Sequence, residues 1–261
     1  MVNNSYFLGL DIGSTTSKAV VLDKNKKLLF FFIIDSGSNL KNSANILYKT
    51  CLRHLKLENI KNIISTGYGR YSASFSKKQI TEITAHAIGS KFLYPKTRTI
   101  IDIGGQDSKI IKLDKDGNVI NFIMNDKCSA GCGRFLENMS KKLNIPLQDF
   151  DKLARKAKKD LKLNSTCTVF QESEIVSCLA KKEKKETIIK SLLTCLVNKI
   201  ISLGSNIGFD KDIILTGGAA KNSLLKIYFN NTLNKKFVTP KEPQITAALG
   251  AALYGLNKFK A

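Results

Sequence analysis

The sequence predicts an α/β fold in which one arrangement of strands occurs twice. Residues 11–23, DIGSTTSKAVVLD, align without gaps to residues 102–114, DIGGQDSKIIKLD, and seven of the thirteen positions are identical. The rest of the chain alternates between short apolar segments of strand length and longer segments with helical periodicity. A duplication combined with alternating strands and helices is typical of an α/β protein.

Each copy of the repeat predicts three consecutive strands. It follows an apolar run, YFLGL or TRTII, and contains a second, AVV or KII. It then reaches a polar turn, DKNKK or DKDGN, and a third apolar run, LLFFFII or VINFIM. Apolar runs separated by polar turns predict a strand–turn–strand–turn–strand meander in each half.

Helices and two further strands are expected between and after the meanders. KDIILTG, at 211–217, is typical of a buried strand that ends in glycine. No low-complexity linker separates the halves, so the repeat alone places their boundary near 95–97. We expect strands at 60–66 and 211–217, and helices at 40–56, 79–93, 130–144, 147–160, 172–204, 219–230 and 243–256.

The composition favours a folded cytoplasmic protein. The 261 residues include 42 Lys and Arg against 21 Asp and Glu, a net charge of +21. The Lys clusters lie at a turn and on expected exposed helix faces, without interleaved aromatic residues, so we expect no nucleic-acid partner. No signal peptide is recognisable, and the longest apolar run, at 28–34, is too short to span a bilayer. We therefore expect no membrane contact, and six cysteines that are free, metal-bound or redox-active.

The first repeat contains a candidate phosphate-binding turn. Glycine permits close backbone approach, and the N–H groups of such a turn can point at phosphate oxygens. Hydroxyl side chains add donors, and the carboxylate of Asp11 can hold Mg²⁺ through water. We assign nucleotide binding to Gly13, Ser14, Thr15, Thr16 and Lys18.

The second repeat and a later glycine pair complete the candidate site. Gly104 and Gly105 form the same kind of turn, and Gln106 or Asp107 could orient an attacking water. Gly217 and Gly218 end a strand and would let a nucleoside lie against the backbone. No GxxxxGK[ST] motif is present, so this is not a P-loop. The alternative is that all these glycines only close hairpins.

Together, the three turns resemble the phosphate-1, phosphate-2 and adenosine motifs of the actin, sugar-kinase and heat-shock-chaperone ATPase superfamily. The resemblance covers nearly the whole chain. It implies a two-lobed actin-like ATPase fold, in which each lobe contains a five-stranded mixed sheet flanked by helices. It also implies a first lobe at 1–95, with a C-terminal helix at 245–261 packed back on it, and a second lobe at 96–244.

Two cysteine motifs resemble one branch of that superfamily. They are NDKCSAGCGRFLE, from residue 125, and CTVFQESE, from residue 167. TGYGR at 66–70, DIGGQDSK at 102–109 and PQITAALGAAL at 243–253 match the same branch. This branch contains the activator ATPases of 2-hydroxyacyl-CoA dehydratases and the ATPase subunits of benzoyl-CoA reductases.

The resemblance implies a 4Fe–4S cluster that bridges a homodimer, with Cys128 and Cys167 of each subunit as ligands. It implies an ATPase, using ATP, ADP and Mg²⁺, that passes low-potential electrons to an iron–sulfur acceptor enzyme. The donor would be a ferredoxin or flavodoxin. The acceptor could be a 2-hydroxyacyl-CoA dehydratase, a benzoyl-CoA reductase or another double-cluster protein. For the two cysteines themselves, buried thiols or a shared zinc site remain alternatives.

The other cysteines and the histidines carry weaker signals. Cys132 stands where the family commonly has Thr, and we interpret it as a small residue near the nucleotide or interface, with a spare thiol at the cluster as the alternative. Cys51, Cys178 and Cys195 are expected to be small buried residues, and His54 and His86 are expected to have structural roles.

A small-molecule kinase of the same fold is the rival hypothesis. It would need a catalytic Asp and a substrate-binding insertion between the lobes, and we find no such insertion. A filament-forming or chaperone ATPase is a third class, which the cysteine motifs disfavour.

Overall fold

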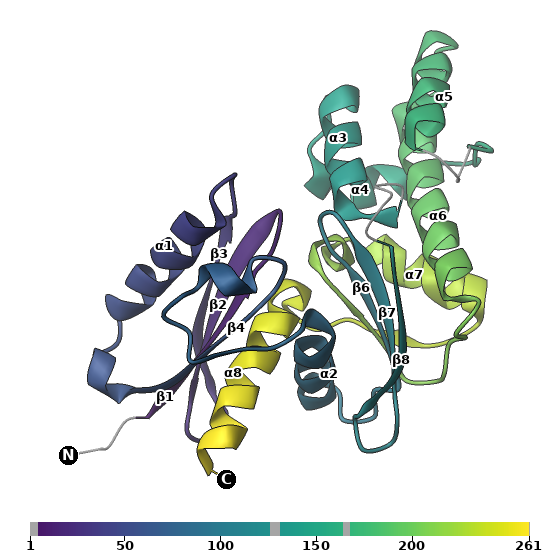
Figure 1. Ribbon diagram of the computed structural model, residues 1–261. Coiled ribbons are helices and arrows are strands. Elements are labelled where there is room, and N and C mark those ends of the chain that lie inside the picture. The colour runs from purple at the N-terminus through teal and green to yellow at the C-terminus, as the bar shows by residue number, and fades with distance from the viewer. Residues whose placement is uncertain (1–4, 126–130, 164–167, 261) are drawn as a thin grey trace. The chain divides into compact units, whose positions relative to one another are not determined.

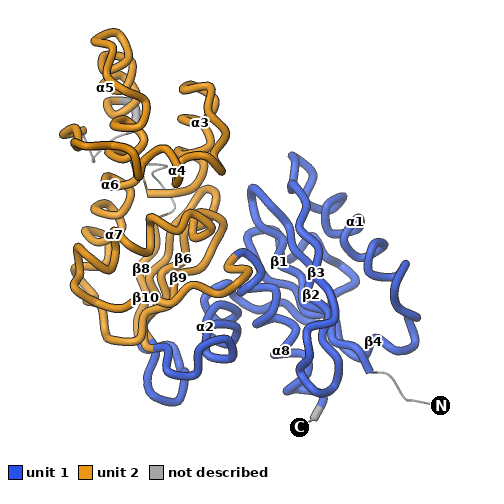
Figure 2. The backbone as a smooth tube through the Cα atoms, turned by 180° about the vertical axis from the view of Figure 1, so that it is seen from behind, with its two compact units in different colours: residues 1–97, 113–120, 244–261 blue, residues 98–112, 121–243 orange. Residues whose placement is uncertain are grey.

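The computed structural model (Figure 1) describes residues 5–125, 131–163 and 168–260. The chain forms two compact units (Figure 2). Unit 1 comprises residues 1–97, 113–120 and 244–261, and unit 2 comprises residues 98–112 and 121–243. Each unit contains one five-stranded mixed sheet with helices packed on it, which confirms the fold expected from the sequence.

The sheet of unit 1 has the strand order β3-β2-β1-β4-β5. β1 pairs antiparallel with β2 and parallel with β4, and β2 pairs antiparallel with β3. The first three strands are therefore the expected meander. The strands are β1 Tyr6–Ile12, β2 Thr16–Asp23, β3 Leu28–Asp35, β4 Ile60–Thr66 and β5 Lys78–Gln79.

Helices cover both faces of this sheet because side chains of a strand alternate between its faces. Leu8 and Leu10 of β1 lie in one apolar cluster with residues of α1, whereas Phe7 lies in another with residues of α8. A Cβ on Gly9 would lie 2.0 Å from the carbonyl oxygen of Ala248, so only glycine permits α8 to lie this close to β1. The helices of unit 1 are α1 Leu40–Leu52, α2 Glu82–Leu93 and α8 Thr246–Lys260, with short 3-10 turns η1 Leu57–Asn59 and η2 Arg70–Ser72.

The sheet of unit 2 repeats this arrangement with the strand order β8-β7-β6-β9-β10. β6 pairs antiparallel with β7 and parallel with β9, as β1 does with β2 and β4. The internal sequence repeat therefore corresponds to a repeat of structure. The strands are β6 Thr99–Ile103, β7 Ser108–Leu113, β8 Val119–Asn125, β9 Ile213–Thr216 and β10 Phe237–Val238.

One large apolar cluster holds the helices of unit 2 on its sheet. α6 contributes most to it, with Ile188, Leu192, Leu196 and Ile200 fully or almost fully buried. The α-helices are α3 Gly133–Leu143, α4 Phe150–Ala154, α5 Thr168–Ala180, α6 Lys185–Gly204 and α7 Ser223–Leu233. The 3-10 turns that accompany them are η4 Leu147–Asp149 and η5 Gly218–Lys221, and η6 Pro243–Ile245 leads into α8.

Two expected helices were wrong in extent. The region 172–204 is divided into α5 and α6, which are separated by a turn in which Lys182 has a φ of +56°. The helix expected at 147–160 ends at Ala154, because the following KAKKD segment offers little apolar surface to bury.

In the described part of the chain, α6 is the one helix long and apolar enough to cross a membrane by length and composition. Of its apolar window, 61% is buried inside the structure. Its apolar character is therefore explained by its place in the core of unit 2.

Candidate functional site

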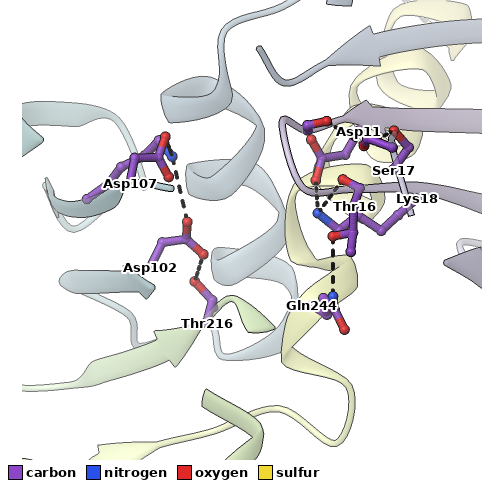
Figure 3. Close-up of polar contacts among 11 residues, drawn as sticks. Asp11, Thr16, Ser17, Lys18, Asp102, Asp107, Thr216 and Gln244 are labelled. Carbon is purple, nitrogen blue, oxygen red and sulfur yellow. Dashed lines mark hydrogen bonds and ion pairs between the residues drawn. The ribbon is translucent and has the colours of Figure 1, made fainter. Parts of the chain in front are cut away.

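The first phosphate turn, residues 13–15, joins β1 to β2 in unit 1. Asp11 is the penultimate residue of β1 and lies opposite Lys18 of β2, with Lys18 Nζ 3.0 Å from Asp11 Oδ2 (Figure 3). The same ammonium donates to the carbonyl oxygen of Thr16 at 3.2 Å. Asp11 is only 7% exposed, so the ion pair fixes its carboxylate beside the turn.

Donor groups of this turn are left without protein acceptors. Within the described residues, the backbone N–H groups of Gly13, Ser14 and Thr15 donate to no protein atom. Thr15 Oγ1 is buried and likewise has no hydrogen-bond partner there. Successive unpaired N–H groups in a turn form an anion-binding concavity. The turn therefore fits a phosphate group.

The second phosphate turn lies at the corresponding place in unit 2. Asp102 is the penultimate residue of β6, is 4% exposed and accepts a hydrogen bond from Thr216 Oγ1 at 2.9 Å (Figure 3). Lys109 Nζ lies 3.8 Å from Asp102 Oδ2 and 2.7 Å from Asp107 Oδ2. Both repeats thus place a lysine beside the aspartate that precedes the turn; Lys109 is buried and Lys18 is partly buried.

The N-terminus of α3 is hydrogen-bonded to the second turn. The N–H of Gly133 donates to the carbonyl of Gly104 at 2.8 Å, and the N–H of Arg134 donates to that of Gly105 at 2.7 Å. Cys132, at the N-cap of α3, is fully buried. The sequence predicted Cys132 to be a small residue near the nucleotide or the interface, and its buried position beside the second turn is compatible with that prediction.

Gly217 brings the end of β9 close to β6. Its φ is +88°, and a Cβ there would lie 2.2 Å from the carbonyl oxygen of Ile103. A side chain would therefore be strained by both conformation and space. A pocket of about 360 Å³ lies beside this junction, lined by Ala220, Lys221, Ser223 and Lys226 and by residues 239–243.

The pocket has the polar character that a nucleoside requires. Thr239 Oγ1, on its wall, is buried without a hydrogen-bond partner among the described residues. Lys221 Nζ pairs with Glu242 at 3.1 Å. Gly217 and Gly218 were predicted from the sequence, whereas the pocket residues Lys221, Thr239 and Glu242 were not. The TPKEP segment that follows β10 was the available signal, because its prolines fix a rigid loop.

Lys109, Thr216 and Ser36, whose Oγ lies 2.6 Å from the carbonyl oxygen of Gly13 in the first turn, were not predicted as site residues. The alignment of the two repeats could have revealed Lys109, because Lys109 occupies the same position in the second repeat as Lys18 in the first. Of the predicted residues, Gln106 is exposed, whereas Asp107 is half-buried and paired with Lys109.

The predicted cluster ligands, Cys128 and Cys167, lie outside the described residues. The described residues contain no group of three or more His, Cys, Asp or Glu side chains that could hold a metal ion. The fit of a cluster therefore depends on the two undescribed segments.

The remaining cysteines lie inside the packed units. Cys51 is fully buried under the sheet of unit 1, and burial raises the pKa of its thiol to about 12. Burial also raises the pKa of Cys195, which is 9% exposed. Cys178 packs against the core of unit 2 and is half-buried. His54 stacks on Phe32, with ring centroids 5.7 Å apart.

Comparison with known proteins identifies one family. Residues 8–255 match the BadF/BadG/BcrA/BcrD ATPase family. The chain is 41% identical to a 2-hydroxyisocaproyl-CoA dehydratase activator from Clostridioides difficile, covering 98% of this chain and 96% of the relative. It is 42% identical to an activator of lactoyl-CoA dehydratase from Anaerotignum propionicum, covering 95% and 96%. The solved structure of the Clostridium difficile activator with bound ADPNP superposes with a TM-score of 0.91, at 40% identity, over 98% of this chain and 96% of that one.

Proposed function

Because the chain belongs to the BadF/BadG/BcrA/BcrD ATPase family, we propose that it is an ATP-dependent activator that delivers electrons to a 2-hydroxyacyl-CoA dehydratase. Its two relatives named above are activators of such dehydratases. A ferredoxin or flavodoxin would supply the electron. A benzoyl-CoA reductase or another double-cluster protein is the alternative acceptor.

Each unit would contribute nucleotide-binding groups, namely the first phosphate turn in unit 1, and the second turn and the pocket after β9 in unit 2. The free N–H groups of residues 13–15 would bind phosphate oxygens, and Thr15 Oγ1 would donate to the same group. Lys18 occupies Oδ2 of Asp11, which favours contact between Asp11 and a hydrated Mg²⁺ over direct ligation. The pocket beside Gly217 would hold adenosine.

Two residues of the second turn would act on the attacking water. Asp107 is engaged by Lys109 at 2.7 Å, so it would orient the water as an acceptor rather than take its proton. Gln106 is exposed and free to turn toward the same water, as a positioning side chain requires. The N–H groups of residues 13–15, which donate to no described protein atom, support this site, because developing negative charge is best stabilised by donors that are already in place.

Cys128 and Cys167 would hold one 4Fe–4S cluster between two subunits, which form a homodimer. Such a cluster supplies a one-electron carrier with thiolate ligands. Two cysteines from each of two chains would provide the usual four ligands at a two-fold interface.

The observation that carries this proposal is the pair of hydrogen bonds from α3 to the second turn. They join Gly133 and Arg134 to Gly104 and Gly105, and Cys128 lies only five residues before Gly133. A movement of the turn on nucleotide binding would therefore displace the segment that bears Cys128. ATP can bias such a movement only if it binds one conformation better than the other.

The direct test mixes the reduced, anaerobic protein with a 2-hydroxyacyl-CoA dehydratase and follows oxidation of the activator by its visible absorbance. We expect oxidation to require both the dehydratase and Mg-ATP. Electron transfer at the same rate without ATP, or a colourless protein that phosphorylates a small molecule, would contradict the proposal. Transfer to benzoyl-CoA reductase alone would select the alternative acceptor.

A further inference from the structure

Ser36 contacts two carbonyl oxygens of the first phosphate turn and the hydroxyl of Ser17 in β2, although it lies outside the repeat motif. It follows β3 and is 2% exposed. Its N–H donates to the carbonyl of Thr15 at 2.9 Å, and its Oγ lies 2.6 Å from the carbonyl of Gly13. The same Oγ lies 2.8 Å from Ser17 Oγ. One residue therefore links both ends of the turn.

The donor and acceptor of each of these hydrogen bonds follow from the number of protons that each group carries. A serine hydroxyl carries one proton, and a carbonyl oxygen only accepts. Ser36 must therefore donate its proton to Gly13, and the contact with Ser17 requires Ser17 to donate to Ser36. The hydroxyl proton of Ser17 is thereby used inside the protein, whereas Thr15 Oγ1 remains unpartnered.

This pattern separates the acceptors of the turn from its donors. Ser36 occupies the carbonyls of Gly13 and Thr15, and Lys18 occupies that of Thr16. The N–H groups of residues 13–15 donate to no described protein atom. If the carbonyls were not occupied in this way, they could rotate toward the phosphate and repel it.

We propose that Ser36 is a positioning residue of the ATPase, which holds the first turn with its N–H groups available to phosphate. It does not touch the nucleotide itself. This inference rests on the proposed role of residues 13–15 in phosphate binding.

Ser36→Ala tests the inference, with Ser43→Ala as the matched control. Ser43 is 3% exposed, and its hydroxyl donates to the backbone carbonyl of Ser36, while the carbonyl of Asn39 lies 3.2 Å away. Both variants lose a buried hydroxyl, so similar decreases in Tm are expected. Only Ser36→Ala should weaken binding of Mg-ADP, by about tenfold, because it loses two hydrogen bonds that order the turn.

Calorimetric titration of the full-length protein with Mg-ADP, alongside KM and kcat for ATP, gives the readout. We expect a raised KM in Ser36→Ala and unchanged constants in Ser43→Ala. Ser17→Ala should weaken binding less, and adding it to Ser36→Ala should cause little further loss, because both remove the same contact. If Ser36→Ala does not fold, Ser17→Ala alone must still weaken binding for the inference to stand.

Thr15→Ala separates failure of this inference from failure of the proposed site. Weakened binding in Thr15→Ala together with wild-type binding in Ser36→Ala would overturn the role of Ser36 and leave the site intact. Wild-type binding in both variants would overturn the proposed phosphate site as well. Equal weakening in Ser43→Ala and Ser36→Ala would mean that Ser36 acts only through general stability, which also overturns the inference.

Discussion

The backbone N–H of Gly133 donates to the carbonyl oxygen of Gly104 at 2.8 Å, which fixes the first residue of α3 to the second phosphate turn. A Cβ at Gly133 would lie 3.1 Å from the same oxygen. That distance is tighter than an ordinary carbon–oxygen contact, so glycine permits this hydrogen bond without displacement of either segment.

Gly133→Ala should weaken the coupling between ATP and electron transfer more than ATP hydrolysis itself. The added methyl group would displace α3 from the turn by a few tenths of an ångström while leaving the side chains of the turn in place. We expect ATPase activity within about threefold of wild type, and a larger loss of ATP-dependent electron transfer. Glu137→Ala is the control, because the carboxylate of Glu137 pairs with the guanidinium of Arg134 at 3.1 Å on the exposed surface of α3. Equal losses of both activities in Gly133→Ala would contradict the coupling.

Asp11→Asn should remove most of the Mg²⁺-dependent ATPase activity while the protein still folds. The substitution keeps the size of the side chain but removes the charge that pairs with Lys18 at 3.0 Å and would hold hydrated Mg²⁺. Loss of a preorganised charged group in an active site lowers kcat by about 100-fold or more. Asp114→Asn, in an exposed hairpin turn, is the control and should keep full turnover. Unchanged turnover in Asp11→Asn would remove Asp11 from the metal site.

Cys132→Thr should retain full iron content, because the family commonly has Thr at this position and the proposed ligands are Cys128 and Cys167. Cys132 is fully buried at the N-cap of α3, where the hydroxyl of Thr can also cap the helix. Iron and acid-labile sulfide, measured anaerobically, are compared with those of Cys128→Ser. A similar loss of iron in the two variants would show that Cys132 is a ligand.

Four cysteines are described in the structure, namely Cys51, Cys132, Cys178 and Cys195. Of these four, Cys178 should be alkylated first in the native protein. Thiolates rather than thiols react with iodoacetamide. Burial raises the pKa of Cys51 to about 12, so this thiol stays protonated at pH 8 and also at pH 10. Burial also raises the pKa of Cys195, and Cys132 is fully buried. Peptide mass mapping after brief labelling measures the order, and early modification of Cys51 would contradict its place in the core.

The repeat made the strands of the two meanders predictable, whereas the two-residue strands β5 and β10 were not expected and the helix boundaries stayed uncertain. β4 was predicted with the bounds it has, because an apolar run between polar flanks leaves few alternatives. The break between α5 and α6 was missed because the lysine-rich segment from 181 to 185 has high helix propensity and contains neither glycine nor proline. Lys182 nevertheless adopts a positive φ there, so the packing of the two helices overrides local propensity.

The residues of the candidate site also fall into two groups, those that the sequence could predict and those that it could not. Asp11 and Gly13 could be assigned because the turn chemistry is contiguous in sequence. Ser36 and Thr216 could not, because they lie 19 and 114 positions away from their partners Ser17 and Asp102. Only the pairing of strands brings such residues together.

The central claim is that one 4Fe–4S cluster is shared by two chains, and ligation of that cluster should also hold the dimer together. The free energy of binding the cluster then contributes directly to association. Oxygen or a chelator should convert the dimer to monomers, as should Cys128→Ser or Cys167→Ser, whereas Cys178→Ser should remain dimeric.

Anaerobic light scattering with parallel iron analysis tests this claim most directly. The account predicts a dimer that carries about four iron atoms in total, as one cubane cluster with four cysteine ligands requires. A monomer with a full cluster, or a dimer with a complete cluster on each chain, would contradict it.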